Sequence, residues 1–145
     1  MPVRPILLVE DCDDDALIFK RVLKRVKLES PVQCVCSVDD AICYLEGQGE
    51  FADRNRFPFP SIIFIDLKLP NRDGFELVEW IKKRPDMRNL FLVVLSGEGR
   101  TLDIAKAYNL GANSFLTKPI RPEDFENLLK GHAISGMADP GVSQP

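Results

Sequence analysis

Four short apolar runs in the sequence each end at residues that are able to do chemistry. In a parallel sheet covered by helices on both faces, strands read as nearly continuous apolar runs, and ligands bind outside the carboxyl ends of those strands. We therefore expect the side chains that follow these runs to meet in one crevice. The runs and the residues at their ends are 6–9 with Glu10 and Asp11, 62–65 with Asp66, 91–95 with Ser96, and 114–116 with Thr117 and Lys118.

Segments with helical periodicity alternate with the apolar runs, which is typical of an α/β protein with a parallel sheet. The first such segment places Phe19 and Leu23 on one apolar stripe. A further strand is expected at residues 32–36, and residues 48–60 are expected to form an extended loop. The five predicted helices span about residues 13–26, 37–45, 74–84, 101–109 and 122–130.

The length, charge and composition of the chain limit the classes of function that it could have. A chain of 145 residues with 45% hydrophobic content has room for one ordinary domain. Its net charge of -3 argues against nucleic-acid binding, which depends on an excess of basic residues. No window has the length and apolarity of a membrane span, so a cytoplasmic location without membrane attachment is expected. The four cysteines are expected to be reduced and mostly buried, because they form neither a C-x-x-C pair nor a disulfide framework.

Three carboxylates at two strand ends form the first candidate site. Glu10, Asp11 and Asp66 repel one another at close range, so the cluster must take up a proton or bind a cation. Mg²⁺ suits such a site because it accepts one or two carboxylates and completes its octahedron with water and phosphate oxygens. The alternative is that acids after the first strand only cap the following helix, and we favour that role for Asp13 and Asp14.

Asp66 is the candidate nucleophile. An aspartate oxygen is able to attack a phosphoryl group and form an acyl phosphate when a metal and nearby donors neutralise the transferred oxygens. Lys118 supplies a compact positive charge, and the Ser96 hydroxyl supplies a hydrogen bond. Taken singly, Lys118 would be a solvated loop lysine and Ser96 a helix cap. The shared site explains both residues together.

The motifs at these strand ends resemble those of one known family, the receiver domains of two-component response regulators. The resemblance covers residues 5–130 and implies a flavodoxin-like (βα)5 three-layer sandwich whose five parallel strands have the order 2-1-3-4-5. The motifs are Leu-Val-Glu-Asp at 8–11, Ile-Asp-Leu-Lys-Leu-Pro at 65–70 with Asp-Gly at 73–74, Val-Leu-Ser-Gly at 94–97, and Phe-Leu-Thr-Lys-Pro at 115–119.

The resemblance also implies roles for individual residues. Asp66 would accept a phosphoryl group from a sensor histidine kinase or a phosphotransfer protein. Glu10, Asp11, Asp66 and the backbone carbonyl of Lys68 would hold Mg²⁺, or Mn²⁺ in its place. Lys118 would bind the phosphoryl group, aimed by a cis peptide bond before Pro119. Such a protein assists its own phosphorylation and dephosphorylation but is not an enzyme in the ordinary sense.

A switch is implied as well. The added charge would draw Ser96 inward, and Phe115 would fill the vacated space. The face made by residues 101–109, 114–117 and 122–130, with Tyr108 and Phe125, would then bind a downstream protein or a second copy of the chain. The alternative for Phe115 is a static core aromatic.

Two positions depart from the common family pattern. Glu10 stands where the family usually has Asp, which places one more methylene between backbone and metal. Lys68 and Glu98 lie two residues past Asp66 and Ser96, respectively. We expect a salt bridge between them at the mouth of the site, and we hypothesise that it obstructs the water that hydrolyses the acyl phosphate.

The loop at 48–60, which contains Phe51, Phe57 and Phe59, is similar to that of single-domain receivers paired with bacterial phytochrome-type kinases. We therefore expect a receiver domain at 1–131, a flexible tail at 132–145 and no output domain. Three alternative functions fit the sequence less well. An aspartyl phosphatase or mutase would need an acid where Lys68 stands. A flavodoxin would lack the acids after the first strand. A constitutive, unphosphorylated interaction module would not need the five-residue site.

Overall fold

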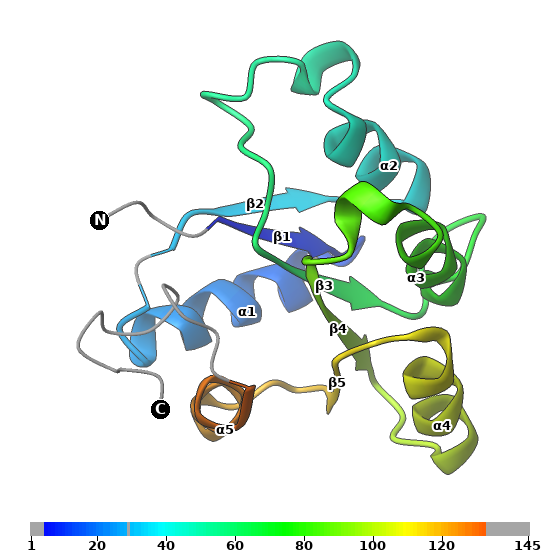
Figure 1. The fold of residues 1–145 in the computed structure, drawn as a ribbon. Helices are drawn as coiled ribbons and strands as arrows, with labels where there is room; N and C mark the ends of the chain where they lie inside the picture. The colour runs from blue at the N-terminus through cyan, green and yellow to red at the C-terminus, as the bar shows by residue number, and fades with distance from the viewer. Residues whose placement is uncertain (1–4, 29, 133–145) are drawn as a thin grey trace.

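A computed structural model describes residues 5–28 and 30–132 of the chain. The described residues contain one parallel sheet with the strand order β2-β1-β3-β4-β5, as Figure 1 shows. This order is the one that the family resemblance implies, so the predicted fold class is confirmed. The strands are β1 (Ile6–Val9), β2 (Val32–Val35), β3 (Ile62–Asp66), β4 (Phe91–Ser96) and β5 (Ser114–Thr117).

Helices cover both faces of this sheet. Helices α1 and α5 lie together on one face, and α2, α3 and α4 form a row on the other (Figure 1). Two short 3₁₀ helices, η1 (Gly49–Phe51) and η2 (Pro85–Met87), follow α2 and α3. The α-helices are α1 (Asp13–Arg25), α2 (Val38–Glu46), α3 (Gly74–Lys82), α4 (Thr101–Leu110) and α5 (Pro122–His132).

The helices on both faces of the sheet explain why the strands are apolar along their whole length. Successive side chains of a strand point to opposite faces of the sheet. In β1, Leu7 and Val9 pack into the core beneath α2 and α3, whereas Ile6 and Leu8 pack into the core beneath α1 and α5. Since both faces are buried, every residue of the strand must be apolar until the strand ends.

Sequence signals placed several helix ends correctly. The Ser37 hydroxyl accepts a hydrogen bond from the Asp40 N–H at the start of α2. Gly47 and Gly111 adopt the left-handed conformation just after α2 and α4, where their lack of a Cβ makes it inexpensive. The predicted helix boundaries differ from the observed ones by at most two residues. Helix α5 continues through Gly131 to His132, while residues 133–145, which contain most of the predicted tail, lie outside the described residues.

Three further expectations need correction. The loop at 48–60 is not wholly extended, because it contains η1. The cysteines are free but not mostly buried: Cys12, Cys34 and Cys36 are exposed and Cys43 is half-buried. Of these residues, Cys34 lies in β2, which is an edge strand, and Cys12 is the N-cap residue of α1. None of the helices within the described ranges is long and apolar enough to cross a membrane.

The loop that follows α2 is fastened to that helix by an arginine. The Arg54 guanidinium donates hydrogen bonds of 2.8 Å to the backbone carbonyls of Tyr44 and Leu45, and one of 3.0 Å to that of Phe57. The rings of Tyr44, Phe51 and Phe57 pack against one another. Because helix carbonyls in the last turn lack helical partners, this arginine completes the end of α2 while it orders the loop.

Candidate functional site

The carboxyl edge of the sheet gathers the residues predicted from the four strand ends. Asp66 and Ser96 are the last residues of β3 and β4, and Glu10 and Lys118 directly follow β1 and β5. Glu10, Asp66 and Ser96 are each no more than 5% exposed. Buried polar side chains need partners, so their contacts with one another decide what this edge is able to do.

The three predicted metal ligands lie together. Glu10, Asp11 and Asp66 each offer a carboxylate oxygen, and these three oxygens lie within 4.8 Å of one another. Glu10 and Asp66 are buried, whereas Asp11 is exposed and open to water. An all-oxygen donor set with one solvent-facing side fits a hard divalent cation that keeps part of its water shell.

The charge state of Glu10 reflects this crowding. Burial, together with the hydrogen bond and negative charge of Asp66, raises the pKa of the Glu10 carboxyl to about 7 against the opposing effect of Lys118. The repulsion inferred from the sequence is therefore present in the fold. A bound divalent cation would relieve this repulsion, because its positive charge stabilises the deprotonated carboxylates that bind it.

Lys118 is the cationic partner of the cluster. Its Nζ lies 2.6 Å from Glu10 Oε1, 2.9 Å from Asp15 Oδ2 and 3.2 Å from Asp66 Oδ2. Burial alone would lower the pKa of the Lys118 ammonium, but the hydrogen bonds to Glu10 and Asp15 and the charge of Asp66 outweigh it and raise the pKa. Lys118 is thus a fixed positive charge beside Asp66 and not a solvated loop lysine.

Asp15 was not predicted as a site residue. The sequence places it in a run of acids at the start of a helix, where capping is the usual role. In the structure Cys12 is the N-cap residue and its side chain makes no cap hydrogen bond. Asp15 instead pairs with Lys118, 103 positions away in the sequence. Its spacing of four residues from Phe19, which puts both residues on one side of α1, was the signal available in the sequence.

The turn after β3 holds Asp66 in place. The Lys68 N–H donates to Asp66 Oδ1 at 3.3 Å, and the Gly74 N–H donates to the Leu67 carbonyl at 2.9 Å. Asp73 and Glu76 exchange hydrogen bonds that form a capping box at the start of α3. The first turn of α3 is thereby tied to the residue that follows Asp66. The metal contact expected of the Lys68 carbonyl stays a prediction.

The Ser96 hydroxyl is bonded within its own loop. It donates to the Glu98 carbonyl at 2.7 Å and accepts from the Glu98 N–H at 3.1 Å. The N-cap residue of α4 is Arg100, so Ser96 does not cap that helix. In this arrangement the hydroxyl is held by its loop and would have to exchange partners to bind a phosphoryl oxygen.

The expected bridge at the mouth of the site is present. Lys68 Nζ lies 2.7 Å from Glu98 Oε1, and Arg100 also contacts Glu98, at 2.6 Å. The hydrogen bond from Lys68 and the charge of Arg100 lower the pKa of the Glu98 carboxyl. The side chain of Lys68 is 79% exposed, so this salt bridge is exposed to solvent.

The predicted partner face is only partly as expected. Phe115 is half-buried against the core beneath α3 and α4, and Tyr108 is 48% exposed. Phe125 is 1% exposed, with its ring centroid 5.4 Å from those of Phe19 and Phe64. The expectation that Phe125 belongs to a partner surface is therefore wrong, because α5 turns this residue toward the sheet.

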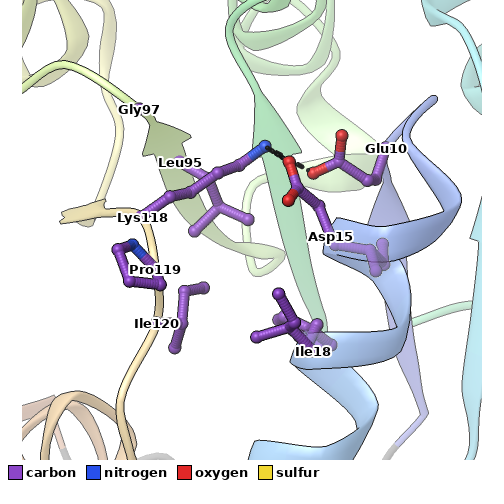
Figure 2. A pocket seen from close by; sticks show the side chains of 10 residues that line it. Glu10, Asp15, Ile18, Leu95, Gly97, Lys118, Pro119 and Ile120 are labelled. Carbon is purple, nitrogen blue, oxygen red and sulfur yellow. Dashed lines mark hydrogen bonds and ion pairs between the residues drawn. The ribbon is translucent and has the colours of Figure 1, made fainter.

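A cavity of about 290 Å³ lies directly beside the acid cluster. Figure 2 shows the Lys118 side chain and Asp15 reaching toward each other across it, with Ile18, Pro119 and Ile120 below. The Lys118–Pro119 peptide bond is cis, as the resemblance implied. Glu10, Asp15 and Lys118 therefore form the charged part of a cavity whose lining is otherwise mostly apolar.

Comparison with known protein families identifies the family to which this chain belongs. Residues 6–130 match the family described as the response regulator receiver domain. The chain belongs to this family. The receiver domain match spans all five strands and nearly all of α5, and it includes each of the strand-end residues from which the site was predicted.

Named receivers are similar over almost their whole length. Response regulator Rcp1 of Synechocystis is 32% identical over 130 residues, which are 90% of this chain and 86% of that protein. The phosphorylated cyanobacterial phytochrome response regulator RcpA is 31% identical, with a TM-score of 0.75 over 90% of this chain and 91% of that chain. The Mn²⁺-bound form of Rcp1 has a TM-score of 0.74 at 30% identity, over 98% and 99%. The predicted likeness to phytochrome-associated receivers is confirmed.

Proposed function

We propose that this receiver domain is the switch of a phosphorelay, in which Asp66 takes a phosphoryl group from a phosphohistidine of a sensor kinase or phosphotransfer protein. One observation carries the proposal. Asp66 is buried at the end of β3, with Oδ2 3.2 Å from the Lys118 ammonium and a carboxylate oxygen within 4.8 Å of oxygens of Glu10 and Asp11. Family membership and the phosphorylated relative RcpA support the same role.

The transfer needs one nucleophile and one leaving group. An Asp66 carboxylate oxygen forms a bond to phosphorus while the bond from phosphorus to the donor's imidazole nitrogen breaks, and the electron pair of that bond stays on the nitrogen. The product is an acyl phosphate on Asp66. Lys118 stabilises the negative charge on the transferred oxygens, because its ammonium directly follows β5 and lies beside Asp66.

Glu10, Asp11, Asp66 and the Lys68 carbonyl are the residues that would hold Mg²⁺ or Mn²⁺. The bound cation would neutralise charge on the phosphoryl oxygens during transfer. The observed oxygen cluster supports this assignment, as does the Mn²⁺-bound relative Rcp1. The longer side chain of Glu10 still brings an oxygen within 4.8 Å of the other two ligands, so the departure from Asp leaves the cluster intact.

Switching would begin at Ser96. To bond a phosphoryl oxygen, its hydroxyl must leave the Glu98 carbonyl, which frees the loop between β4 and α4. Phe115 lies half-buried near that region and would move into the vacated space. The exposed Leu102 and Tyr108 of α4 would then change position and bind a downstream protein or a second copy of the chain.

The direct test of the proposal is the intact mass of the protein after incubation with a small phosphodonor such as acetyl phosphate. With Mg²⁺ present, the protein is expected to gain one phosphoryl group. With a chelator in place of Mg²⁺ the gain is expected to fall to background, because charge on the transferred oxygens is no longer neutralised. No gain in either condition would favour the alternative, a receiver fold that serves as a constitutive interaction module.

The Lys68–Glu98 bridge leads to a prediction about the lifetime of the phosphate. Lys68→Ala is expected to speed dephosphorylation of Asp66 by roughly two- to five-fold, a modest factor because the bridge is exposed and such pairs are weak. The measurement is the loss of the phosphorylated mass after donor removal. Arg72→Ala is the matched control, since Arg72 lies in the same turn and forms another bridge, 2.7 Å from Asp39 and not to Glu98. Equal rates for Lys68→Ala and the parent would refute the hypothesis.

A further inference from the structure

The Lys118 ammonium is held by three carboxylates, of which only two belong to the metal cluster. It donates hydrogen bonds to Glu10 and Asp15, and it forms an ion pair of 3.2 Å with Asp66. Asp15 is the one acceptor outside the group that is arranged to hold a cation. It comes from the first turn of α1, while Lys118 follows β5, so this contact joins two elements across the site (Figure 2).

We propose that Asp15 is a positioning residue, which holds the Lys118 ammonium beside Asp66 while the phosphoryl group is transferred. This inference rests on the proposed function and assigns a role to a residue that the motifs do not contain. Asp15 does not touch the reacting atoms. It acts through Lys118, whose side chain is 16% exposed and would otherwise have a path to solvent.

The need for Asp15 follows from the chemistry of the other two acceptors. A cation bound by Glu10 and Asp66 would draw on their oxygen electron pairs, and Asp66 would give one oxygen to phosphorus during transfer. Both contacts to Lys118 would therefore weaken at the moment when its position matters. The contact of 2.9 Å to Asp15 is independent of metal and phosphoryl group, so it remains.

The position of Asp15 is fixed by the packing of its helix. Asp15 and Phe19 are four residues apart and lie on the same side of α1. The Phe19 ring packs edge-on against Phe64 of β3, with centroids 4.8 Å apart, and against Phe125 of α5. Because Phe64 is two residues before Asp66, the same contact sets the distance between α1 and the nucleophile's strand.

The negative charge of Asp15 is expected to help more than it hinders. As an anion near the site it repels a phosphodonor, but its side chain is 37% exposed and this long-range effect is weakened by solvent and salt. The charge-assisted hydrogen bond to Lys118 is short-range and retains its effect in salt. Neutralising Asp15 should therefore slow the transfer, and added salt should not remove the difference.

The test is a double-mutant cycle on the rate of phosphorylation by a small phosphodonor at saturating Mg²⁺. Asp15→Asn is expected to slow the reaction about ten-fold, as for the loss of a charged hydrogen bond. In the Lys118→Ala background the same substitution is expected to have no further effect, because the group it positions is gone. Asp14→Asn is the matched control: it removes the same charge from an exposed neighbour in the same turn. Asp15→Glu should restore part of the rate.

A second readout needs no phosphorylation. The rate at which an amine-acylating reagent modifies Lys118, followed by peptide mass spectrometry, is expected to rise several-fold in Asp15→Asn and to stay unchanged in Asp14→Asn. Unchanged labelling and an unchanged phosphorylation rate in Asp15→Asn would overturn the inference. An equal slowing by Asp15→Asn with and without Lys118 would also overturn it. A parent protein that takes up no phosphoryl group would instead refute the proposed function, and the labelling would still report whether Asp15 holds Lys118.

Discussion

Asp66→Asn is expected to take up no phosphoryl group under conditions in which the parent protein gains one. Asparagine has nearly the shape of aspartate, but its amide oxygen lacks the negative charge that makes the carboxylate a nucleophile. The side chain is buried with Lys118 as its neighbour, so a group of the same size is required to keep the site intact. The measurement is the intact mass after incubation with phosphodonor and Mg²⁺.

The variant should remain folded, which makes its loss of function interpretable. Glu10 and Asp66 repel each other, as the raised pKa of Glu10 indicates, and the substitution removes one of the two charges. Asp86→Asn is the control, since Asp86 is an exposed aspartate in η2, which precedes the amino end of β4, whereas Asp66 lies at the carboxyl end of β3. Phosphoryl uptake by Asp66→Asn at the parent's level would show that another residue is the acceptor.

Gly74→Ala is expected to destabilise the protein by about 2 kcal/mol. This is the largest effect expected of a substitution that removes no functional group. A Cβ at this position would lie 2.4 Å from the Asp66 carbonyl oxygen and 2.9 Å from Cγ2 of Ile65. Overpacking costs about 1–3 kcal/mol, and backbone that cannot rotate away lies at the upper end. The helix propensity of alanine offsets roughly 1 kcal/mol of that cost.

The destabilisation would be measured by urea unfolding of the metal-free protein, as a lower midpoint at unchanged slope. Gly97→Ala is the matched control, because a Cβ there meets nothing within 4 Å. The variant should also be phosphorylated more slowly, since α3 has to move away from the residue that it holds in place. A midpoint for Gly74→Ala equal to that of Gly97→Ala would contradict the close approach between α3 and Asp66.

The fold and most of the site followed from local sequence pattern. A strand buried on both faces must be apolar, so polar residues are tolerated only where the strand ends. The positions of Asp66 and Ser96 at the ends of apolar runs therefore predicted both the sheet and the edge at which the site lies. Glu10 and Lys118 followed by the same reasoning. The order of the strands in the sheet could not be predicted in this way, because an apolar run does not show which other strand it pairs with. The order was predicted from the family resemblance.

What the sequence could not predict depends on tertiary contacts between distant segments. Asp15 looked like a helix-capping acid, since only the fold brings β5 to the start of α1. Phe125 looked like a surface aromatic, but the rotation of α5 that buries it is set by packing against Phe19 and Phe64. The bond from Ser96 to Glu98 depends on a loop conformation that no periodicity records.

The central claim is that Asp66 carries the phosphoryl group, and its most direct test is to locate that group chemically. Borohydride reduces an aspartyl phosphate to homoserine, so the protein would be treated with phosphodonor and Mg²⁺, reduced and digested, and the peptide that spans β3 sequenced by mass spectrometry. We predict homoserine at position 66 and at no other aspartate. Homoserine at Asp11 or elsewhere, with Asp66 intact, would contradict the account.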